Sequence, residues 1–236
     1  MGSTRLPGKI LAPIVDDLPL LVTLAKRISS PEIEWWIATT EEKQDDIIEC
    51  WAEQLGLNIF RGSSDDVLSR FIAISKIANP DWIIRVTADD PFMDRHIISK
   101  LINMIPHLDT DINLVCDIPG EKKFPLGYVP ELIRTTALEE ASLRISKSEL
   151  YHRQHVTSFL LSGKVKQVAY EFAPIRPEWR WTVDTATDLL MMRKAFQLLG
   201  ANWEEIYYSK LVELFDGNPH IMKINKAVRQ KAINEG

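Results

Sequence analysis

Short apolar runs alternate with amphipathic stretches along the first half of the chain. The pattern predicts strands at residues 32–40, 58–62, 81–91 and 111–116. Helices are predicted between them, at residues 41–56, 63–80 and 94–105. Ser63 or Ser64 is expected to cap the second helix, which stops before Pro80, and Gly56 is expected to end the first. This β-α-β-α order is typical of a parallel sheet covered by helices on both faces.

The alternation of predicted strands and helices stops after residue 117. The segment 117–135 contains three prolines and two glycines, which favours a loop or short hairpin that protrudes from the main sheet toward a ligand or a partner subunit. Beyond it the pattern predicts helices at 135–145, 148–162 and 187–200, strands at 164–174 and 178–185, and a helical tail at 203–236. Since neither an internal repeat nor a linker divides the chain, we expect one domain over 1–236.

Composition and charge exclude several classes of protein. The chain has 236 residues, 45% of them hydrophobic, and a net charge of −5. This balance argues against a nucleic-acid coat protein or a binder of anionic membranes. Cys50 and Cys116 lack the spacing of a zinc site or a disulfide framework, so we expect a reducing, cytoplasmic setting. No apolar run approaches the ~20 residues of a membrane span, and no signal peptide is recognisable.

The first nine residues, Met-Gly-Ser-Thr-Arg-Leu-Pro-Gly-Lys, have the composition of an anion-binding loop. Gly2 lets backbone amides approach a phosphate closely, and Ser3 adds a hydroxyl donor. Arg5 and Lys9 add the two cations that a polyphosphate needs. The spacing is not that of a Walker loop. A flexible arm with two solvated cations is the alternative interpretation.

Two acidic sites follow predicted strands. Asp89 and Asp90 fall where the strand at 81–91 ends, the edge at which open α/β sheets bind ligands. Asp184 likewise ends the predicted strand 178–185, and the two carboxylates Asp89 and Asp184 are candidates to share one Mg²⁺. The alternative is that these residues only shape turns and caps, with Thr185 and Asp188 forming a capping box.

A third polar group lies on the helix predicted at 148–162. Arg153 and His155 fall there beside Tyr151. His152 and His155 are three residues apart rather than four, and no third ligand is evident, so a metal site is not expected. A solvated polar face of the helix is the simpler interpretation of the local sequence.

Together these stretches resemble the acylneuraminate cytidylyltransferase-like family, in its spore coat polysaccharide biosynthesis branch. The stretches that carry the resemblance occur in the family's order and are MGSTRLPGK, FRGSSDDVLSRF, RVTADDPFMD, FPLGYVPE, YHRQHVT and RWTVDTATDL. The resemblance runs from Met1 to about Gly200. It implies a Rossmann-like, GT-A nucleotidyltransferase fold with a mostly parallel central sheet. It also implies transfer of CMP from CTP to a sugar, commonly a 2-keto sugar acid such as a sialic acid or Kdo, with release of pyrophosphate.

The resemblance also implies roles for particular residues. Those assigned to the nucleotide are Gly2, Ser3, Arg5, Lys9, Arg61 and Ser63. Arg5, Lys9, Asp89 and Asp184 are the catalytic set, with Asp89 and Asp184 as Mg²⁺ ligands. The residues placed near the acceptor sugar are Gly127, Glu131, Arg153 and His155. The expected ligands are CTP and a small sugar acceptor. The protein is expected to be a cytoplasmic homodimer that binds neither nucleic acid nor membrane.

Three departures from the family pattern bear on activity. Ala88 stands where a glycine is usual, and Asp90, after the metal aspartate, adds a negative charge near the phosphates. The segment Tyr128-Val129-Pro130-Glu131 lacks an expected carboxylate at its second position, which leaves the acceptor open. Family members also carry a hydrophobic strand and Gln-Ala-Arg before the loop. Without them, we expect a central strand to be missing from the sheet and Met1 to be an internal start or the edge of a shortened chain.

Two alternative functions stay open from the sequence. One is a catalytically inactive, nucleotide-binding homologue, which the missing first strand favours and which the retained Arg5, Lys9, Asp89 and Asp184 oppose. The other is a nucleotidyltransferase for another nucleotide or for an acceptor that is not a sugar.

Overall fold

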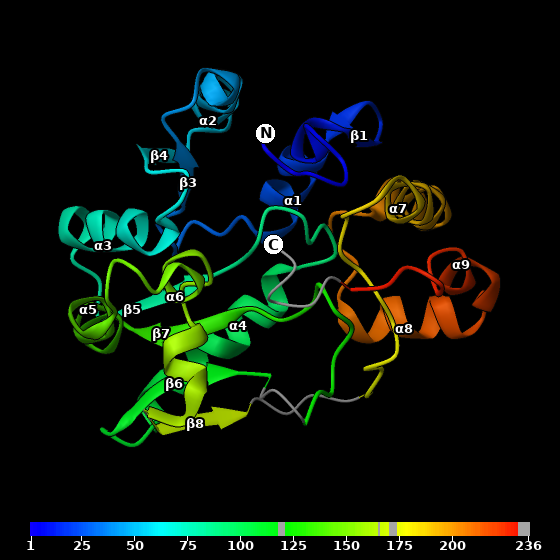
Figure 1. Ribbon diagram of the computed structural model, residues 1–236. Coiled ribbons are helices and arrows are strands. Elements are labelled where there is room, and N and C mark those ends of the chain that lie inside the picture. The colour runs from blue at the N-terminus through cyan, green and yellow to red at the C-terminus, as the bar shows by residue number, and fades with distance from the viewer. Residues whose placement is uncertain (118–120, 165, 170–173, 231–236) are drawn as a thin grey trace.

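Two sheets, a separate two-stranded hairpin and the helices around them make up the described residues, 1–117, 121–164, 166–169 and 174–230, of a computed structural model (Figure 1). The smaller sheet pairs β3 (Trp36–Thr40) in parallel with β4 (Asn58–Gly62). The larger sheet contains β5 (Trp82–Arg85), β7 (Glu131–Arg134), β6 (Ile112–Cys116) and β8 (Lys166–Ala169), in that spatial order.

One strand of the larger sheet runs against the others. β7 pairs antiparallel with both β5 and β6, whereas β6 and β8 pair in parallel. It follows that β5, β6 and β8 share one direction. The expected α/β fold with a mostly parallel sheet flanked by helices is confirmed, with β7 as the reversed strand.

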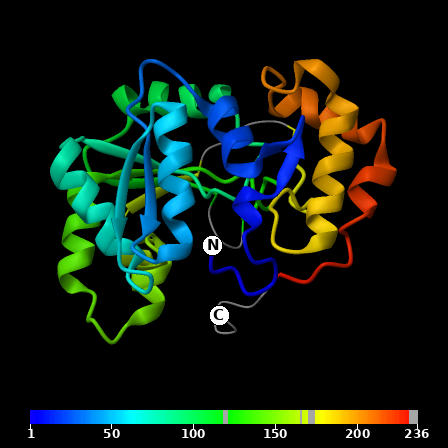
Figure 2. The ribbon, with the colours of Figure 1, turned by 90° about the horizontal axis from the view of Figure 1, so that it is seen from above.

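Helices flank the sheets. They are α1 (Leu20–Ile28), α2 (Asp46–Leu55), α3 (Val67–Ala78), α4 (Arg95–Met104), α5 (Thr135–Arg144), α6 (Leu150–Gln154), α7 (Ala186–Leu199), α8 (Tyr208–Asp216) and α9 (Pro219–Lys223). The views in Figures 1 and 2 agree that α7, α8 and α9 lie on one side of the molecule and that α3 and α5 lie on the other. A 3₁₀ turn at Lys9–Leu11 and a hairpin of β1 (Pro13–Val15) and β2 (Leu18–Pro19) precede α1.

Local sequence signals place several elements correctly. β4 spans the predicted 58–62, and Gly56 follows α2 in the left-handed conformation that glycine tolerates. Thr185 and Asp188 form the capping box at the start of α7. The cap of α3, however, is Asp66, whose carboxylate accepts from Ser69 N at 2.9 Å. The prediction of Ser63 or Ser64 as the cap was therefore wrong.

Three other predictions need correction. The segment 117–135 does not simply leave the sheet, because its last part is β7, in the middle of the larger sheet. Residues 178–185 form one isolated bridge, Leu126 with Arg180, rather than a strand. The stretch 148–162 is broken at residues 155–157 and is helical again from residue 158. Residues 118–120, 170–173 and 231–236 of the predicted loop, strand and tail lie outside the described residues.

An aromatic cluster joins the sheet to the C-terminal helices. Phe92 packs against Trp181 and Phe196, with ring centroids 5.1 Å apart in both pairs. Beside it Arg27, fully buried on α1, donates to the carbonyl oxygens of Phe92, Met93, Trp203 and Ile206. Buried cations are stable only when their donors are satisfied. Arg27 thereby fixes the turn that follows β5, where Asp89 and Asp90 lie.

An apolar groove separates the two sheets. Its volume is about 710 Å³, and its walls include side chains of β3, β5 and α1. Among the described residues, neither β3 nor β5 pairs with a strand on its second side. No described strand therefore joins β3 to β5, and the loss of a first strand stays a prediction.

The described residues show neither a membrane helix nor a disulfide. No helix among them combines the length and the apolar character that crossing a bilayer requires. Cys50 is exposed and Cys116 is buried, and both are free thiols.

Candidate active site

A lysine from the N-terminal loop joins two carboxylates that are distant in the sequence. The Nζ atom of Lys9 lies 2.5 Å from Asp89 Oδ2 and 2.8 Å from Asp184 Oδ1. Burial by itself would lower the pKa of Lys9, but the two carboxylates outweigh burial and raise the pKa above its ordinary value. The ammonium therefore stays charged, and it holds the opening loop against the edge of the sheet.

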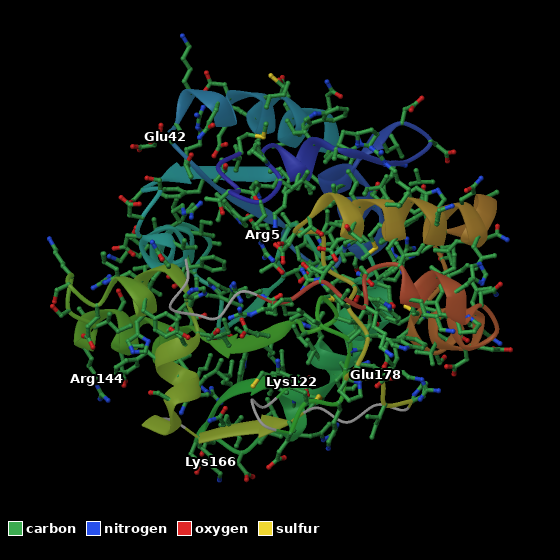
Figure 3. All side chains as sticks on the ribbon, turned by 45° about the vertical axis from the view of Figure 1, so that its right-hand side comes forward. Arg5, Glu42, Lys122, Arg144, Lys166 and Glu178 are labelled. Carbon is green, nitrogen blue, oxygen red and sulfur yellow. The ribbon has the colours of Figure 1, made fainter. Side chains whose placement is uncertain are left out.

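Two arginines also form ion pairs with Asp184. Arg5 Nη2 lies 2.8 Å and Arg180 Nη2 2.7 Å from its Oδ2 atom. Burial would raise the pKa of Asp184, yet the lysine and the two arginines lower it. In the view of Figure 3 Arg5, which is half-buried, lies near the middle of the molecule, whereas Glu42, Arg144 and Lys166 lie toward its periphery.

The backbone brings the two aspartates together although no strand ends at Asp184. Val183 N donates to Asp89 O at 2.9 Å, so the extended segment before α7 lies against the turn after β5. Arg180 is itself fixed by Asp188, which is fully buried and accepts from Nε at 2.9 Å and Nη2 at 3.1 Å. Asn225 donates to Asp188 and to the carbonyl of Arg180. Arg180 and Asn225 were not identified from the sequence, although Arg180 lies only four residues before Asp184.

Asp90 is a buried neighbour of the pair rather than a charge exposed to a ligand. Burial, together with the charge of Asp89, raises its pKa to about 7. Thr87 donates a hydrogen bond to its carboxyl group. The expected extra negative charge is therefore absent below about pH 7.

The remaining nucleotide candidates lie outside this cluster. Arg61 binds Asp46 and Glu49 of α2 at 2.6 and 3.0 Å, and also the carbonyls of Thr40 and Glu42. Ser63 Oγ accepts from two amides of its own turn. Ser3 Oγ accepts from Leu6 N at 3.4 Å and so shapes the opening loop, in which Gly2 is exposed. The structure brings Arg5 and Lys9 to the aspartates, but not Arg61 or Ser63.

Two of the acceptor candidates, Glu131 and His155, lie near Arg85, whereas Arg153 makes other contacts. Glu131 on β7 binds Arg85 at 2.6 Å and Thr157 at 2.7 Å. Arg153 donates to the Ser142 and Ile145 carbonyls at 3.1 and 2.7 Å, and so joins α6 to α5. Desolvation, helped by the charge of Arg85, lowers the pKa of His155. Arg85 was not identified from the sequence.

Gly127 fits a place where no side chain is tolerated. Its φ is +98°, and a Cβ atom there would lie 2.6 Å from Thr182 N and from the carbonyl carbon of Trp181. The close approach of these two segments, which also pair through Leu126 and Trp181, requires glycine. Gly127 thus positions the segment that carries Asp184.

The cluster has the chemistry of a hard-cation site. Carboxylate oxygens of Asp89 and Asp184 both contact the ammonium of Lys9, so they converge on one positive charge. Mg²⁺ takes one or two protein carboxylates and completes its shell with water and substrate phosphate. The described residues contain no group of three or more acidic, histidine or cysteine ligands. The two carboxylates match the number that Mg²⁺ takes from a protein.

Comparisons with known proteins agree with this geometry. Residues 1–214 match the family model described as cytidylyltransferase. The chain is 31% identical over 229 residues to the spore coat polysaccharide biosynthesis protein SpsF of Bacillus subtilis (strain 168), covering 93% of this chain and 92% of SpsF. A cytidylyltransferase structure from Leptospira borgpetersenii serovar Hardjo-bovis (strain JB197) superimposes with a TM-score of 0.87 at 28% identity, over 98% of this chain and 95% of that one.

A more distant structure shares the fold. The CMP:2-keto-3-deoxy-manno-octonic acid synthetase, solved with CTP, has a TM-score of 0.60 at 16% identity, over 83% of this chain and 94% of that one. Three findings agree. The fold is that of nucleotidyltransferases, the family model matches most of the chain, and the similarity to SpsF extends over nine tenths of both chains. This chain belongs to the cytidylyltransferase family.

Proposed function

We propose that this protein transfers CMP from CTP to a sugar, with release of pyrophosphate, in the biosynthesis of a cell-surface polysaccharide. The observation that carries the proposal is the convergence of Arg5, Lys9, Asp89 and Asp184 at one edge of the fold. The similarity to SpsF supports the polysaccharide role. A 2-keto sugar acid is the acceptor class we favour, and the CTP-bound synthetase of the same fold acts on such an acid, as its name states.

Charge balance supports the use of a divalent cation. Arg5, Lys9 and Arg180 face the carboxylates of Asp89, Asp184 and Asp188, so the charges of the cluster cancel. A triphosphate would meet no excess of positive charge there. Mg²⁺ held by Asp89 and Asp184 would supply it, neutralising the phosphates and the leaving pyrophosphate.

The side chains of the site would then bind and orient the substrates. With Asp89 and Asp184 holding Mg²⁺, the ammonium of Lys9 and the guanidinium of Arg5 would be free to donate to phosphate oxygens. An acceptor hydroxyl would attack the α-phosphorus as the bond to pyrophosphate breaks. Alignment of the two substrates, rather than a covalent intermediate on the enzyme, would supply most of the rate enhancement.

The test is release of pyrophosphate with CTP, Mg²⁺ and a panel of acceptors that includes a sialic acid, Kdo and sugar 1-phosphates. We expect turnover with a 2-keto sugar acid, and its loss in Asp89→Asn. Arg144→Gln changes an exposed residue on α5 and should keep full turnover. Turnover only with sugar 1-phosphates would refute the acceptor class. Turnover with another nucleotide, but not with CTP, would refute the donor.

A further inference from the structure

The C-terminal segment around α9 reaches back to the candidate active site. The Nδ2 atom of Asn225, a residue only 2% exposed, donates to Asp188 Oδ1 at 2.9 Å and to the carbonyl oxygen of Arg180 at 3.0 Å. Gln230 Oε1 accepts a hydrogen bond from Nη1 of the same arginine. Because these contacts converge on Arg180, we call residues 222–230 the C-terminal clasp.

Asp188, which lies between the clasp and the site, orients its neighbours. It is fully buried, so its carboxylate is out of reach of solvent. Its Oδ1 atom accepts from Arg180 Nε at 2.9 Å and from Asn225. Its Oδ2 atom accepts from Arg180 Nη2 and from the amides of Asp184 and Thr185, all at 3.0–3.1 Å. A carboxylate has about four lone-pair positions, so its capacity is used, and the two contacts to one guanidinium fix the plane of that group.

The fixed guanidinium gives the two carboxylate oxygens of Asp184 different surroundings. Arg180 Nη2 lies 2.7 Å from Oδ2, and Arg5 approaches the same oxygen at 2.8 Å. Oδ1 faces Lys9 at 2.8 Å, and the same ammonium binds Asp89. The χ2 torsion of an aspartate is otherwise soft. The direction of Oδ1 therefore depends on Arg180 and, through it, on the clasp.

Asparagine suits position 225 because its amide nitrogen offers two hydrogens to two acceptors. An apolar side chain of similar size would leave the Arg180 carbonyl without this donor and would remove one of the contacts that hold Asp188. The backbone before Asn225 is anchored as well. Met222, on α9, accepts a hydrogen bond at its Sδ atom from the indole Nε1 of Trp181 at 3.3 Å. The clasp thus grips two successive residues of the segment that leads to Asp184.

We propose that Asn225 is a positioning residue of the donor site. Through Arg180 it aims Oδ1 of Asp184 at the position that Lys9 occupies, where a divalent cation would bind. The clasp lies beyond residues 1–214, which match the family model. The benefit of this orientation for nucleotide transfer rests on the proposed function, whereas the orientation itself can be measured without metal or nucleotide.

The experiment compares Asn225→Leu with Asn218→Leu, a matched control at the start of α9. Asn218 is half-buried, and its Nδ2 atom donates to the Leu214 carbonyl at 2.9 Å, a contact within the C-terminal helices. Asn225→Ser, whose hydroxyl keeps one donor, is a milder variant for the case that leucine prevents folding. Thermal unfolding establishes that each variant is folded before the site is probed.

Amide hydrogen exchange of the opening loop is the measurement. The amides of Gly8 and Lys9 donate to carbonyls within this loop, at 3.1 and 3.2 Å, and the loop is held in place through Asp184. We expect these two amides to exchange about fivefold faster or more in Asn225→Leu than in Asn218→Leu, and by a smaller factor in the serine variant. Exchange equal to that of the Asn218→Leu control would overturn the proposal.

A double-mutant cycle shows whether Asn225 acts through Asp184. In Asp184→Asn the loop has already lost this anchor, so adding Asn225→Leu should change the exchange by less than about twofold. An equal factor in both backgrounds is what general destabilisation produces, and it would also overturn the proposal.

The affinity for Mn²⁺, measured in parallel by electron paramagnetic resonance, should fall about tenfold in Asn225→Leu and stay unchanged in Asn218→Leu. If the unmodified protein bound no Mn²⁺, the proposed metal site would be refuted, and the exchange measurements would still decide the role of Asn225.

Discussion

The ammonium of Lys9 lies 2.5 Å from a carboxylate oxygen of Asp89, a residue eighty positions away, and 2.8 Å from Asp184. A lysine between two carboxylates occupies the position that suits a divalent cation. The same contact orders the opening loop, and it would compete with a metal ion for the two carboxylates that we propose as its ligands.

Removing this ammonium should improve the binding of metal in the absence of nucleotide. In Lys9→Met the two carboxylates keep their places but lose a cation that must otherwise be displaced. We expect the affinity for Mn²⁺ alone, measured by electron paramagnetic resonance, to rise about tenfold. Unchanged or weaker binding of Mn²⁺ would show that Lys9 does not compete with the metal.

The same substitution should weaken the binding of a triphosphate more than that of a monophosphate. We expect Lys9→Met to lower the affinity for CTP by roughly 10- to 100-fold in the presence of Mg²⁺, since a charge-assisted hydrogen bond is lost. The affinity for CMP, which has no β- or γ-phosphate, should change little. Calorimetric titration measures both, with Lys26→Met as the control, because Lys26 is a half-exposed lysine of α1 that binds Glu204. An equal loss for the two nucleotides would contradict the role of Lys9.

Asp90 should make the protein less stable as the pH rises. Its pKa of about 7 in the folded state exceeds its ordinary value of 3.8. Between these values the folded protein keeps a proton that the unfolded chain releases, so the free energy of unfolding falls as the pH rises from about 4 to 7. Asp90→Asn, which is always neutral, removes this fall.

The corresponding measurement is thermal unfolding at pH 5 and pH 8 in a metal-free buffer. We expect Asp90→Asn to be close to the unmodified protein at pH 5. At pH 8 it should be more stable, by on the order of 2 kcal/mol, a rise of several degrees in Tm. Asp17→Asn, at an exposed position in the β1–β2 turn, should show no such dependence. A pH-independent difference for Asp90→Asn would argue against a buried, protonated Asp90.

Gly127→Ala tests the close packing that supports Asp184. The added Cβ atom would meet backbone atoms of Trp181 and Thr182, which cannot move independently of the site. Gly56→Ala is a matched control, because Gly56 also has a positive φ but has nothing within 4 Å of an added Cβ. In urea unfolding we expect Gly127→Ala to cost about 2 kcal/mol more than Gly56→Ala. Equal costs would show that the clash is relieved elsewhere.

The sequence predicts those parts of the fold whose signals are local. The apolar run of β4, the glycine after α2 and the Thr185–Asp188 capping box all depend on neighbouring residues, and all are confirmed. β7 was missed because its four residues follow a segment rich in proline and glycine, and its place in the sheet comes from long-range pairing with β5 and β6. The apolar stretch 181–183 has the composition of a strand but packs as an extended segment inside the aromatic core.

The candidate site shows the same division. Sequence motifs led to Arg5, Lys9, Asp89 and Asp184, which the structure brings together. They did not lead to Arg180, because its importance depends on Asp188 and Asn225, and Asn225 lies in the C-terminal tail. Nor did they show that Arg61 and Arg153 already bind carboxylates and carbonyls of the protein itself. Such contacts form through tertiary packing, which a pattern of residues along the sequence does not reveal.

The most direct test of the account is calorimetric titration of the protein with CTP, with and without Mg²⁺, in parallel with Asp89→Asn and Arg144→Gln. We predict Mg²⁺-dependent binding of CTP that is retained in Arg144→Gln and lost in Asp89→Asn. Binding of CTP that is indifferent to Mg²⁺ and to Asp89, or no binding at all, would contradict the assignment of the Lys9–Asp89–Asp184 cluster as the donor site.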